Sequence, residues 1–252
     1  MIHPSAYVSP KAKIADSACI GPWCLVDDFA EIGENVVLES RVHVHSHVKI
    51  GAGTFVFDGA SLGNAPQDMK FRGEETTLEI GARTKIREYV TVHRGTSVSG
   101  KTFIGNDVLL MAYVHVAHDC VIENGAVISN GVQLGGHVHV GEFANIGGTS
   151  GVAQNCRIGT FSFVGASLKV DKDVPPYVKA LGDPLRFAGV NLHALRKFPV
   201  RFPENRIVEI ERLYREFFHS KETVDECAKK LAESGDSAVR DFFSKENIRV
   251  IR

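Results

Sequence analysis

The sequence has no long apolar run, no large excess of charge and no dense set of cysteines. Lys and Arg number 29 against 30 Asp and Glu, so the formal net charge of −1 gives no global reason to expect nucleic acid or an anionic membrane as a partner. No apolar run approaches the ~20 residues that span a bilayer, and no basic start followed by an apolar stretch opens the chain. We therefore expect no membrane insertion and a cytoplasmic location.

The five cysteines do not form a short, secreted, disulfide-dense pattern. We interpret them as reduced thiols. Cys24, Cys120 and Cys156 stand at small-residue positions of the repeat described next, where they are expected to fill the core rather than to bind metal or to react.

An aliphatic residue recurs at every sixth position from Ile2 to Val170, and only Asp68 and Glu74 break the series. Neither a helix nor a hairpin sheet has this period. It predicts an all-β left-handed parallel β-helix, a hexapeptide-repeat prism in which three hexads form a coil of 18 residues and the aliphatic residue points inward. Glycine often follows the inward residue, as at Gly21 and Gly141, which suggests a turn that needs permissive φ.

The pattern predicts three parts of the chain. The prism covers 1–172, with excursion loops near 63–79 and 93–103, and long loops on a rigid solenoid often carry function. The two prolines of DVPPYV cannot continue a ladder, so 173–190 is expected to be a linker. Apolar residues at spacings of three and four then predict a small α-helical C-terminal domain over 191–252.

The 18-residue coil provides a ruler that places residue n beneath residue n+18. It puts His118 under Gly136 and Asp119 under His137. A histidine with a free face is a candidate general base, and the backbone N–H of a nearby glycine can receive an oxyanion. The alternative is that these histidines, with His115 and His139, merely decorate a solvated face.

Metal binding is a further possibility, because histidines from neighbouring subunits hold zinc in β-helix carbonic anhydrases. The spacing of His115, His118 and His137 does not match such a trio, so we expect no metal. The run His43, His45, His47 alternates like a metal clip, but we interpret it as part of the surface.

Several motifs resemble a known family in order and spacing over the whole chain. They are PQDMK at 66–70, HRGT at 93–96, AHDC at 117–120, GGHV at 135–138, DVPPY at 173–177 and GVN at 189–191. With the prism and the helical tail, they resemble the UDP-N-acetylglucosamine O-acyltransferases, which perform the first committed step of lipid A synthesis.

The resemblance implies transfer of an (R)-3-hydroxyacyl group from acyl carrier protein to the 3-hydroxyl of UDP-N-acetylglucosamine, in a homotrimer with sites between subunits. His118 matches the general base and Gly136 the oxyanion donor, while Asp119 would hold or polarise neighbouring groups. The remaining matched positions are expected to contact substrates: Asp68, Lys70, His115, His137, Gln154, Asn191, Arg196 and Lys197. No cofactor is expected, because the thioester on the carrier is already activated.

The carrier is acidic, so its docking surface should be basic. The segment 179–215 is richer in Lys and Arg than in acids, which favours steering of an anionic carrier. A solvated helix face is the alternative reading.

The sequence departs from the family at Ala153, where a histidine is common, at His193, where an acid is expected, and after Lys197. These changes put the uridine pocket in doubt. Ala166, Phe163 and Lys169 align near the end of the acyl groove and predict a discrete preference for chain length.

Other functions remain open at this stage. Related hexapeptide enzymes use a 3-amino UDP-sugar or acetyl-CoA, although those that use acetyl-CoA lack the PQDMK loop and the GVN segment. A noncatalytic β-helix scaffold or a γ-class carbonic anhydrase would be a protein of another class.

Overall fold

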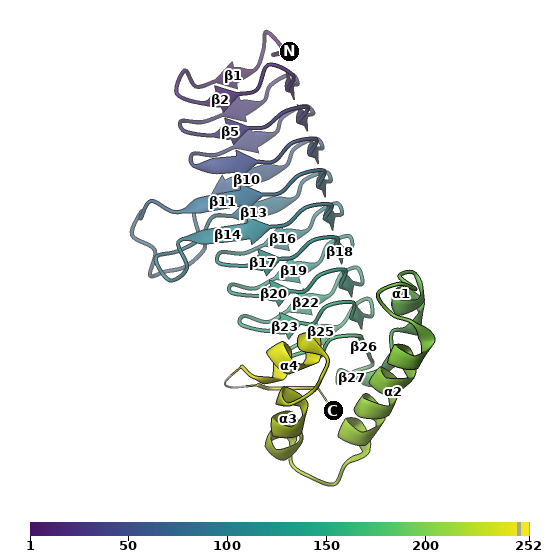
Figure 1. Ribbon diagram of the computed structural model, residues 1–252. Coiled ribbons are helices and arrows are strands. Elements are labelled where there is room, and N and C mark those ends of the chain that lie inside the picture. Colours follow the sequence, from purple (N-terminus) through teal and green to yellow (C-terminus); the bar gives the residue numbers. More distant parts are fainter. Residues whose placement is uncertain (246–247, 252) are drawn as a thin grey trace.

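The computed structural model describes residues 1–245 and 248–251. It is a left-handed parallel β-helix whose coils stack into a three-sided prism, with helices at the C-terminal end (Figure 1). The repeat sets this shape, because each hexad supplies a short strand and a corner.

The three sides of the prism are three sheets, which are parallel except for the last strand of the third. The first sheet contains β1 (Tyr7–Val8), β4 (Leu25–Val26), β7 (His43–Val44), β10 (Ser61–Asn64), β13 (Thr91–His93), β16 (His115–Val116), β19 (Gln133–Leu134), β22 (Gly151–Val152) and β25 (Lys169–Val170). The second sheet contains β2 (Lys13–Ile14), β5 (Glu31–Ile32), β8 (Val48–Ile50), β11 (Thr77–Ile80), β14 (Lys101–Ile104), β17 (Val121–Ile122), β20 (His139–Val140) and β23 (Arg157–Ile158). The third sheet contains β3 (Cys19–Ile20), β6 (Val37–Leu38), β9 (Phe55–Val56), β12 (Lys85–Ile86), β15 (Leu109–Leu110), β18 (Val127–Ile128), β21 (Asn145–Ile146), β24 (Phe163–Val164), β26 (Val178–Leu181) and β27 (Arg186–Val190).

The core of the prism is made by the aliphatic residue of each hexad. Val26, Val44 and Leu62 have no exposed surface and lie above one another in the first sheet. Burying a side chain of this size contributes ~1.5–3 kcal/mol, so the stacked column supplies much of the stability. Cys24, Cys120 and Cys156 are also buried and free, as expected of core fillers.

The expected reason for the repeated glycines is wrong. The corner residue in the left-handed region comes two positions later, for example Trp23 (φ 56°) and Phe143 (φ 54°), and it is usually not glycine. A Cβ on Gly21 would lie 2.7 Å from the carbonyl oxygen of Glu39, and one on Gly141 would lie 2.5 Å from the nitrogen of Thr160. These glycines are needed because the next coil passes too close for a side chain.

The 18-residue ruler holds for regular coils and fails at two excursions. Val26 pairs with Val44, but Leu62 pairs with Val92 and Val92 with Val116. Residues 65–76 leave the prism between β10 and β11, and residues 94–100 leave it between β13 and β14. The first excursion is the loop that projects from the side of the prism in Figure 1.

The C-terminal part closes the end of the prism. Within 173–190, β26 extends the third sheet in parallel and β27 pairs with it in the antiparallel direction. The helices are α1 (Leu192–Arg196), α2 (Glu204–His219), α3 (Val224–Ala232) and α4 (Ser237–Phe243). Helix α2 buries Ile207, Ile210, Tyr214 and Phe217, as its spacing predicts. Among the described residues, no helix is both long and apolar enough to cross a bilayer.

Candidate active site

The predicted catalytic residues lie at one edge of the prism, where the chain turns from the first sheet to the second. We call this corner the first edge; residues 117–120, 135–138 and 153–156 occupy it in three successive coils. The backbone ladder fixes the stacking, because the N–H of His137 donates to the carbonyl of His118 at 3.0 Å, and the N–H of Asn155 donates to that of Gly136 at 3.0 Å.

His118 and Asp119 form a hydrogen-bonded pair although they are neighbours in sequence. Nδ1 of His118 lies 2.7 Å from Oδ2 of Asp119. Successive side chains of a strand point to opposite faces, but Asp119 has a φ of 60°, and this corner conformation brings its carboxylate to the ring. Only 9% of the His118 side chain is exposed in the single chain, so the ring is more buried than its position in the sequence suggests.

Asp119 has no exposed side-chain surface, but both oxygens of its carboxylate accept hydrogen bonds. Thr96 donates twice, from its backbone N–H at 2.9 Å and from its hydroxyl at 2.8 Å, and the hydroxyl of Ser99 donates to Oδ1. Burial raises the pKa of Asp119, but the hydrogen bonds from Ser99, Thr96 and His118 outweigh burial and lower the pKa to about 2. The carboxylate is therefore anionic and holds the imidazole in place.

Gly136 lies directly against the other side of the imidazole. A Cβ at Gly136 would lie 2.6 Å from Cε1 and 2.8 Å from Nε2 of His118, so any other residue would displace the ring. Within the described residues Nε2 of His118 has no hydrogen-bond partner, and the backbone N–H of Gly136 donates to none. A free basic nitrogen and a free amide donor thus lie in neighbouring coils, as the ruler predicts.

His137 and His115 flank this centre. The His137 ring meets that of His118 edge to face, with 5.1 Å between centroids, and its Nε2 lies 3.7 Å from Oδ2 of Asp119. His115 lies on the first sheet, where its Nδ1 is 2.7 Å from the hydroxyl of Thr91. Burial, followed by the nearby His118, lowers the pKa of His115, which favours its neutral form at neutral pH.

His118, Asp119 and His137 also satisfy the spacing needed to hold a metal ion. However, the Asp119 carboxylate is already engaged by Thr96 and Ser99, in addition to His118. The donor set therefore fits an orienting hydrogen-bond network better than a metal centre.

Sequence reasoning missed three residues of this environment, namely His93, Thr96 and Ser99. The ring of His93 lies 4.8 Å from that of His115, centroid to centroid, and its Nδ1 is buried without a partner among the described residues. Burial, with smaller effects from His115 and other histidines, lowers its pKa to about 4. Two of these residues belong to the HRGT motif. The excursion of 94–100 changes the 18-residue spacing, so the spacing does not predict that they lie near His115 and Asp119.

Asp68 and Lys70 lie in the first excursion and do not join the His118 centre within one chain. The carboxylate of Asp68 accepts the backbone N–H of Lys70 at 2.9 Å, which is a local turn contact, and the Lys70 side chain is exposed. No hydrogen bond or ion pair in the described residues links either side chain to His118 or Asp119.

Gln154 stacks one coil beyond Gly136 on the first edge and is exposed. Ala153, where the sequence departs from the family, is exposed as well. Asn191 lies elsewhere. Its side-chain amide donates to the carbonyl of Phe161 at 2.9 Å, at the edge between the second and third sheets. Asn191 is buried, so within one chain it serves to anchor the start of α1.

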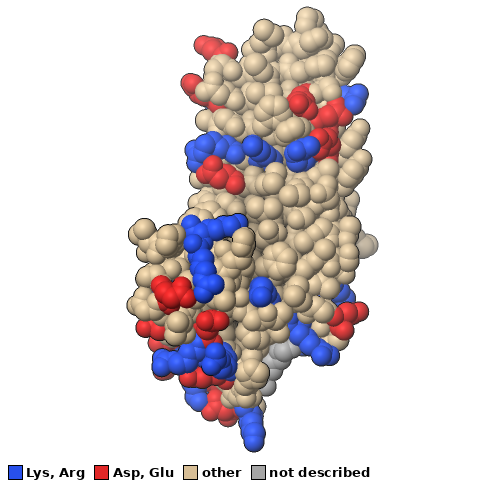
Figure 2. Space-filling view, turned by 90° about the vertical axis from the view of Figure 1, so that its right-hand side faces the viewer, with Lys and Arg blue, Asp and Glu red and all other residues tan. Residues whose placement is uncertain are grey.

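Arg196 and Lys197 are exposed at the end of α1. Arg196 pairs with Glu204 at 3.0 Å, and nearby Arg201 pairs with Glu142 at 2.8 Å. Figure 2 shows side chains of both signs side by side at the helical end of the molecule. The local excess of positive charge is therefore partly neutralised by neighbouring acids.

The residues predicted to limit acyl length lie on other parts of the prism. Ala166 is at the edge between the third and first sheets, Phe163 is half-buried on the third sheet, and Lys169 projects from the first sheet, 3.3 Å from Asp171. All three lie around one corner, since Phe163 is in the strand before it, Ala166 is within it and Lys169 is in the strand after it.

Two protein families match the chain. The family described as Udp N-acetylglucosamine O-acyltransferase, domain 2, matches residues 173–251, and the bacterial transferase hexapeptide family matches residues 101–136.

Solved structures match the chain over its full length. A UDP-N-acetylglucosamine O-acyltransferase from Moraxella catarrhalis is 40% identical, covers 100% of this chain and 99% of its own, and has a TM-score of 0.94. A counterpart from Acinetobacter baumannii is 34% identical with the same coverage and a TM-score of 0.94. A UDP-N-acetylglucosamine acyltransferase from Arabidopsis is 30% identical, with coverage of 100% and 99% and a TM-score of 0.83.

Proposed function

The chain belongs to the UDP-N-acetylglucosamine O-acyltransferase family, and from this premise we propose that it moves an (R)-3-hydroxyacyl group from acyl carrier protein to the 3-hydroxyl of UDP-N-acetylglucosamine. This is the first step of lipid A synthesis. The observation that carries the proposal is the His118 ring, which is held at Nδ1 by Asp119 and is free at Nε2 beside Gly136.

His118 acts as the general base. Nε2 removes the proton of the sugar 3-hydroxyl while the sugar oxygen attacks the thioester carbonyl carbon. The buried carboxylate of Asp119 stabilises the imidazolium that forms. When the tetrahedral intermediate collapses, the carbon–sulfur bond breaks and the imidazolium returns the proton to the departing thiolate of the carrier.

Gly136 stabilises the charge that develops on the carbonyl oxygen. Its backbone N–H is uncommitted and lies beside the basic nitrogen, so one carbonyl group can meet both. Such a donor contributes most when water is excluded, and loss of one costs about 10²–10³ in kcat. The thioester on the carrier needs no further activation, so the proposed reaction uses no cofactor.

We further propose that the site is completed in a homotrimer. His118 lies on the first edge, whereas Asn191 is fixed at another edge through Phe161, and Lys70 lies on an excursion. One rigid prism cannot bring these edges together. A closed ring of three chains can, because it places one edge of each prism against a neighbour.

The acyl carrier protein would dock near the helical end. Arg196 and Arg201 have acidic partners, whereas the exposed Lys197 and Arg186 form no ion pair within the described part of the chain and would add free positive charge there. Charge of this kind would mainly raise the association rate, and it would do so less at high salt.

The direct test is an assay of UDP-N-acetylglucosamine with a panel of 3-hydroxyacyl carriers, read by mass spectrometry. We expect one acyl group per sugar, a discrete length preference, and a loss of about 10²–10⁴-fold in rate for His118→Ala. The substitution should leave the melting temperature close to that of the wild type. A flat length profile would refute a steric ruler at Ala166, and full activity of His118→Ala would refute the proposed base.

A further inference from the structure

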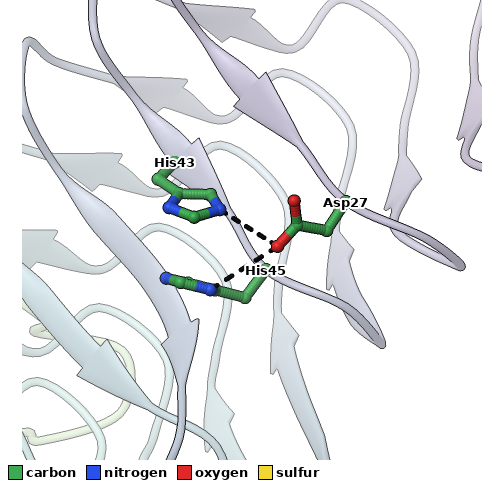
Figure 3. Close-up of side chains that lie close together, drawn as sticks. All are labelled: Asp27, His43 and His45. Carbon is green, nitrogen blue, oxygen red and sulfur yellow. Dashed lines mark hydrogen bonds and ion pairs between the residues drawn. The ribbon is translucent and has the colours of Figure 1, made fainter. Parts of the chain in front are cut away.

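A second cluster of ionisable side chains lies at the first edge, several coils before the His118 centre. It consists of Asp27, His43 and His45 (Figure 3). Nε2 of His43 lies 3.0 Å from Oδ2 of Asp27, and Nδ1 of His45 lies 3.6 Å from the same oxygen. Both rings therefore direct a nitrogen at one carboxylate oxygen. The proposed acyltransfer uses none of these groups.

The prism holds the three side chains from adjacent coils. Asp27 follows β4, while His43 lies in β7 and His45 follows it, and the N–H of Asp27 donates to the carbonyl of Val44 at 2.9 Å. The ladder therefore fixes the backbone positions. Because these positions are set by the fold, little ordering entropy opposes capture of a ligand by the three side chains.

The spacing of the donor atoms suits a transition metal. Two donors that each lie about 2.0–2.1 Å from a metal are about 3.0 Å apart across a right angle and about 3.4 Å apart across a tetrahedral angle. The observed separations of 3.0 and 3.6 Å span these values. All three donors lie within 4.8 Å of one another, so small side-chain rotations complete the arrangement.

The surroundings of His45 fix the orientation that ligation requires. Its second nitrogen, Nε2, lies 3.1 Å from the hydroxyl of Ser61, and its ring stacks on that of His43 with 3.7 Å between centroids. A hydrogen bond on the nitrogen that faces away from the metal is the usual support of a ligating histidine.

We propose that Asp27, His43 and His45 form a binding site for a first-row divalent transition-metal ion of the Zn²⁺ class, with water in its remaining positions. Two imidazoles and one carboxylate are a donor set that such ions prefer over Mg²⁺ or Ca²⁺. Positively charged Arg94 acts on His45 and opposes a cation, so we expect micromolar rather than nanomolar affinity. The ion would tie two neighbouring coils together.

This site is separate from the proposed reaction centre. His45 lies three coils before Ala117, and at ~4.8 Å per coil this places the cluster roughly 14 Å from the neighbourhood of His118. The inference therefore does not depend on the proposed function, and it is tested on the full chain without any measurement of acyl transfer.

The experiment is titration of the metal-free protein with Zn²⁺ in a calorimeter, together with Co²⁺ absorption spectra to report coordination. We expect one ion per chain at this cluster and a higher melting temperature with Zn²⁺. His43→Gln and His45→Gln should each weaken this binding by at least ~10-fold. The matched control is His47→Gln, which removes an equally accessible histidine of the same run that does not face Asp27.

Three results would overturn the proposal. The first is absence of stoichiometric Zn²⁺ binding to the wild type, and the second is an equal loss in His47→Gln. The third is binding that survives in His43→Gln and His45→Gln but disappears in His137→Gln, which would assign the ion to the His118 centre. Circular dichroism of each variant verifies that the prism is intact.

Discussion

At the scale of single residues, one bend of the backbone creates the hydrogen-bonded pair that we propose for catalysis. His118 and Asp119 would diverge in a strand, but the left-handed corner at Asp119 joins the carboxylate to the ring. The sequence predicts the histidine, and the 18-residue ruler predicts the glycine one coil above it. It leaves the source of the orienting carboxylate open, because the backbone conformation of a non-glycine corner residue is not apparent from the repeat.

The contact between Gly136 and the imidazole leads to a prediction for Gly136→Ala. Gly136 does not have positive φ, so the backbone accepts alanine, but the new methyl group collides with Cε1 of His118 and displaces the ring. A displacement of about 1 Å costs ~10²-fold, and we expect kcat to fall by about this factor. Steady-state kinetics and a melting curve are the measurements.

The control for this substitution is Gly151→Ala, where an added methyl group meets nothing within 4 Å. It should retain activity and stability. If Gly136→Ala were as active as the control, the ring would not need its observed position.

The buried His93 predicts a loss of stability in mild acid. Its pKa is about 4 in the folded protein, against about 6.5 when unfolded, so the unfolded chain binds the proton first. The stabilising contribution is complete above pH 6.5 and is lost as the pH falls toward 4, a change of about 3 kcal/mol. Urea unfolding from pH 7 to 4 should show a steeper decline for the wild type than for His93→Gln, and parallel declines would contradict this assignment.

At the scale of elements, the excursion over 94–100 supplies the donors that hold Asp119, and it is also the segment whose contacts the repeat does not predict. The hexad repeat predicts every regular coil, because each coil needs the same inward residue. It does not predict that this excursion folds back so that Thr96 and Ser99 reach Asp119. A loop has no period. The excursion also lengthens the sequence separation between stacked residues, so that Val92 pairs with Val116 instead of a residue 18 positions later. His93 was missed for the same reason.

The loop contact predicts a positioning role for Ser99. Ser99→Ala removes one hydrogen bond from the buried carboxylate, which orients the imidazole less well. A bond to a charged group is worth ~1.5–3 kcal/mol, so we expect kcat to fall about 10-fold or more while KM changes little. Ser99→Thr, which keeps the hydroxyl, should recover most of the rate.

The pH–rate profile separates this role from a general loss of folding. Loss of the donor raises the pKa of Asp119, so the acid limb of kcat should move to higher pH in Ser99→Ala. A lower rate with an unchanged profile and a lower melting temperature would instead indicate a purely structural role for Ser99.

At the scale of the whole molecule, the prism distributes the predicted site residues over separate edges. The first edge carries His118 and Gln154, while Asn191 is tied to the edge between the second and third sheets. A single β-helix is too stiff to bring two edges together, since every backbone rung is hydrogen-bonded to the next. The proposed site therefore requires assembly of several chains, which the repeat alone does not specify.

Shared sites predict complementation between two inactive variants. Within a mixed homotrimer of His118→Ala and Asn191→Ala chains, some interfaces join an intact His118 of one chain to an intact Asn191 of its neighbour. With random assembly about one quarter of the sites are intact, so refolding an equal mixture should restore about one quarter of wild-type activity. Separate refolding followed by mixing should restore none until subunits exchange. If each site were contained in one chain, the mixture would be as inactive as its components, and the shared-edge arrangement would be wrong.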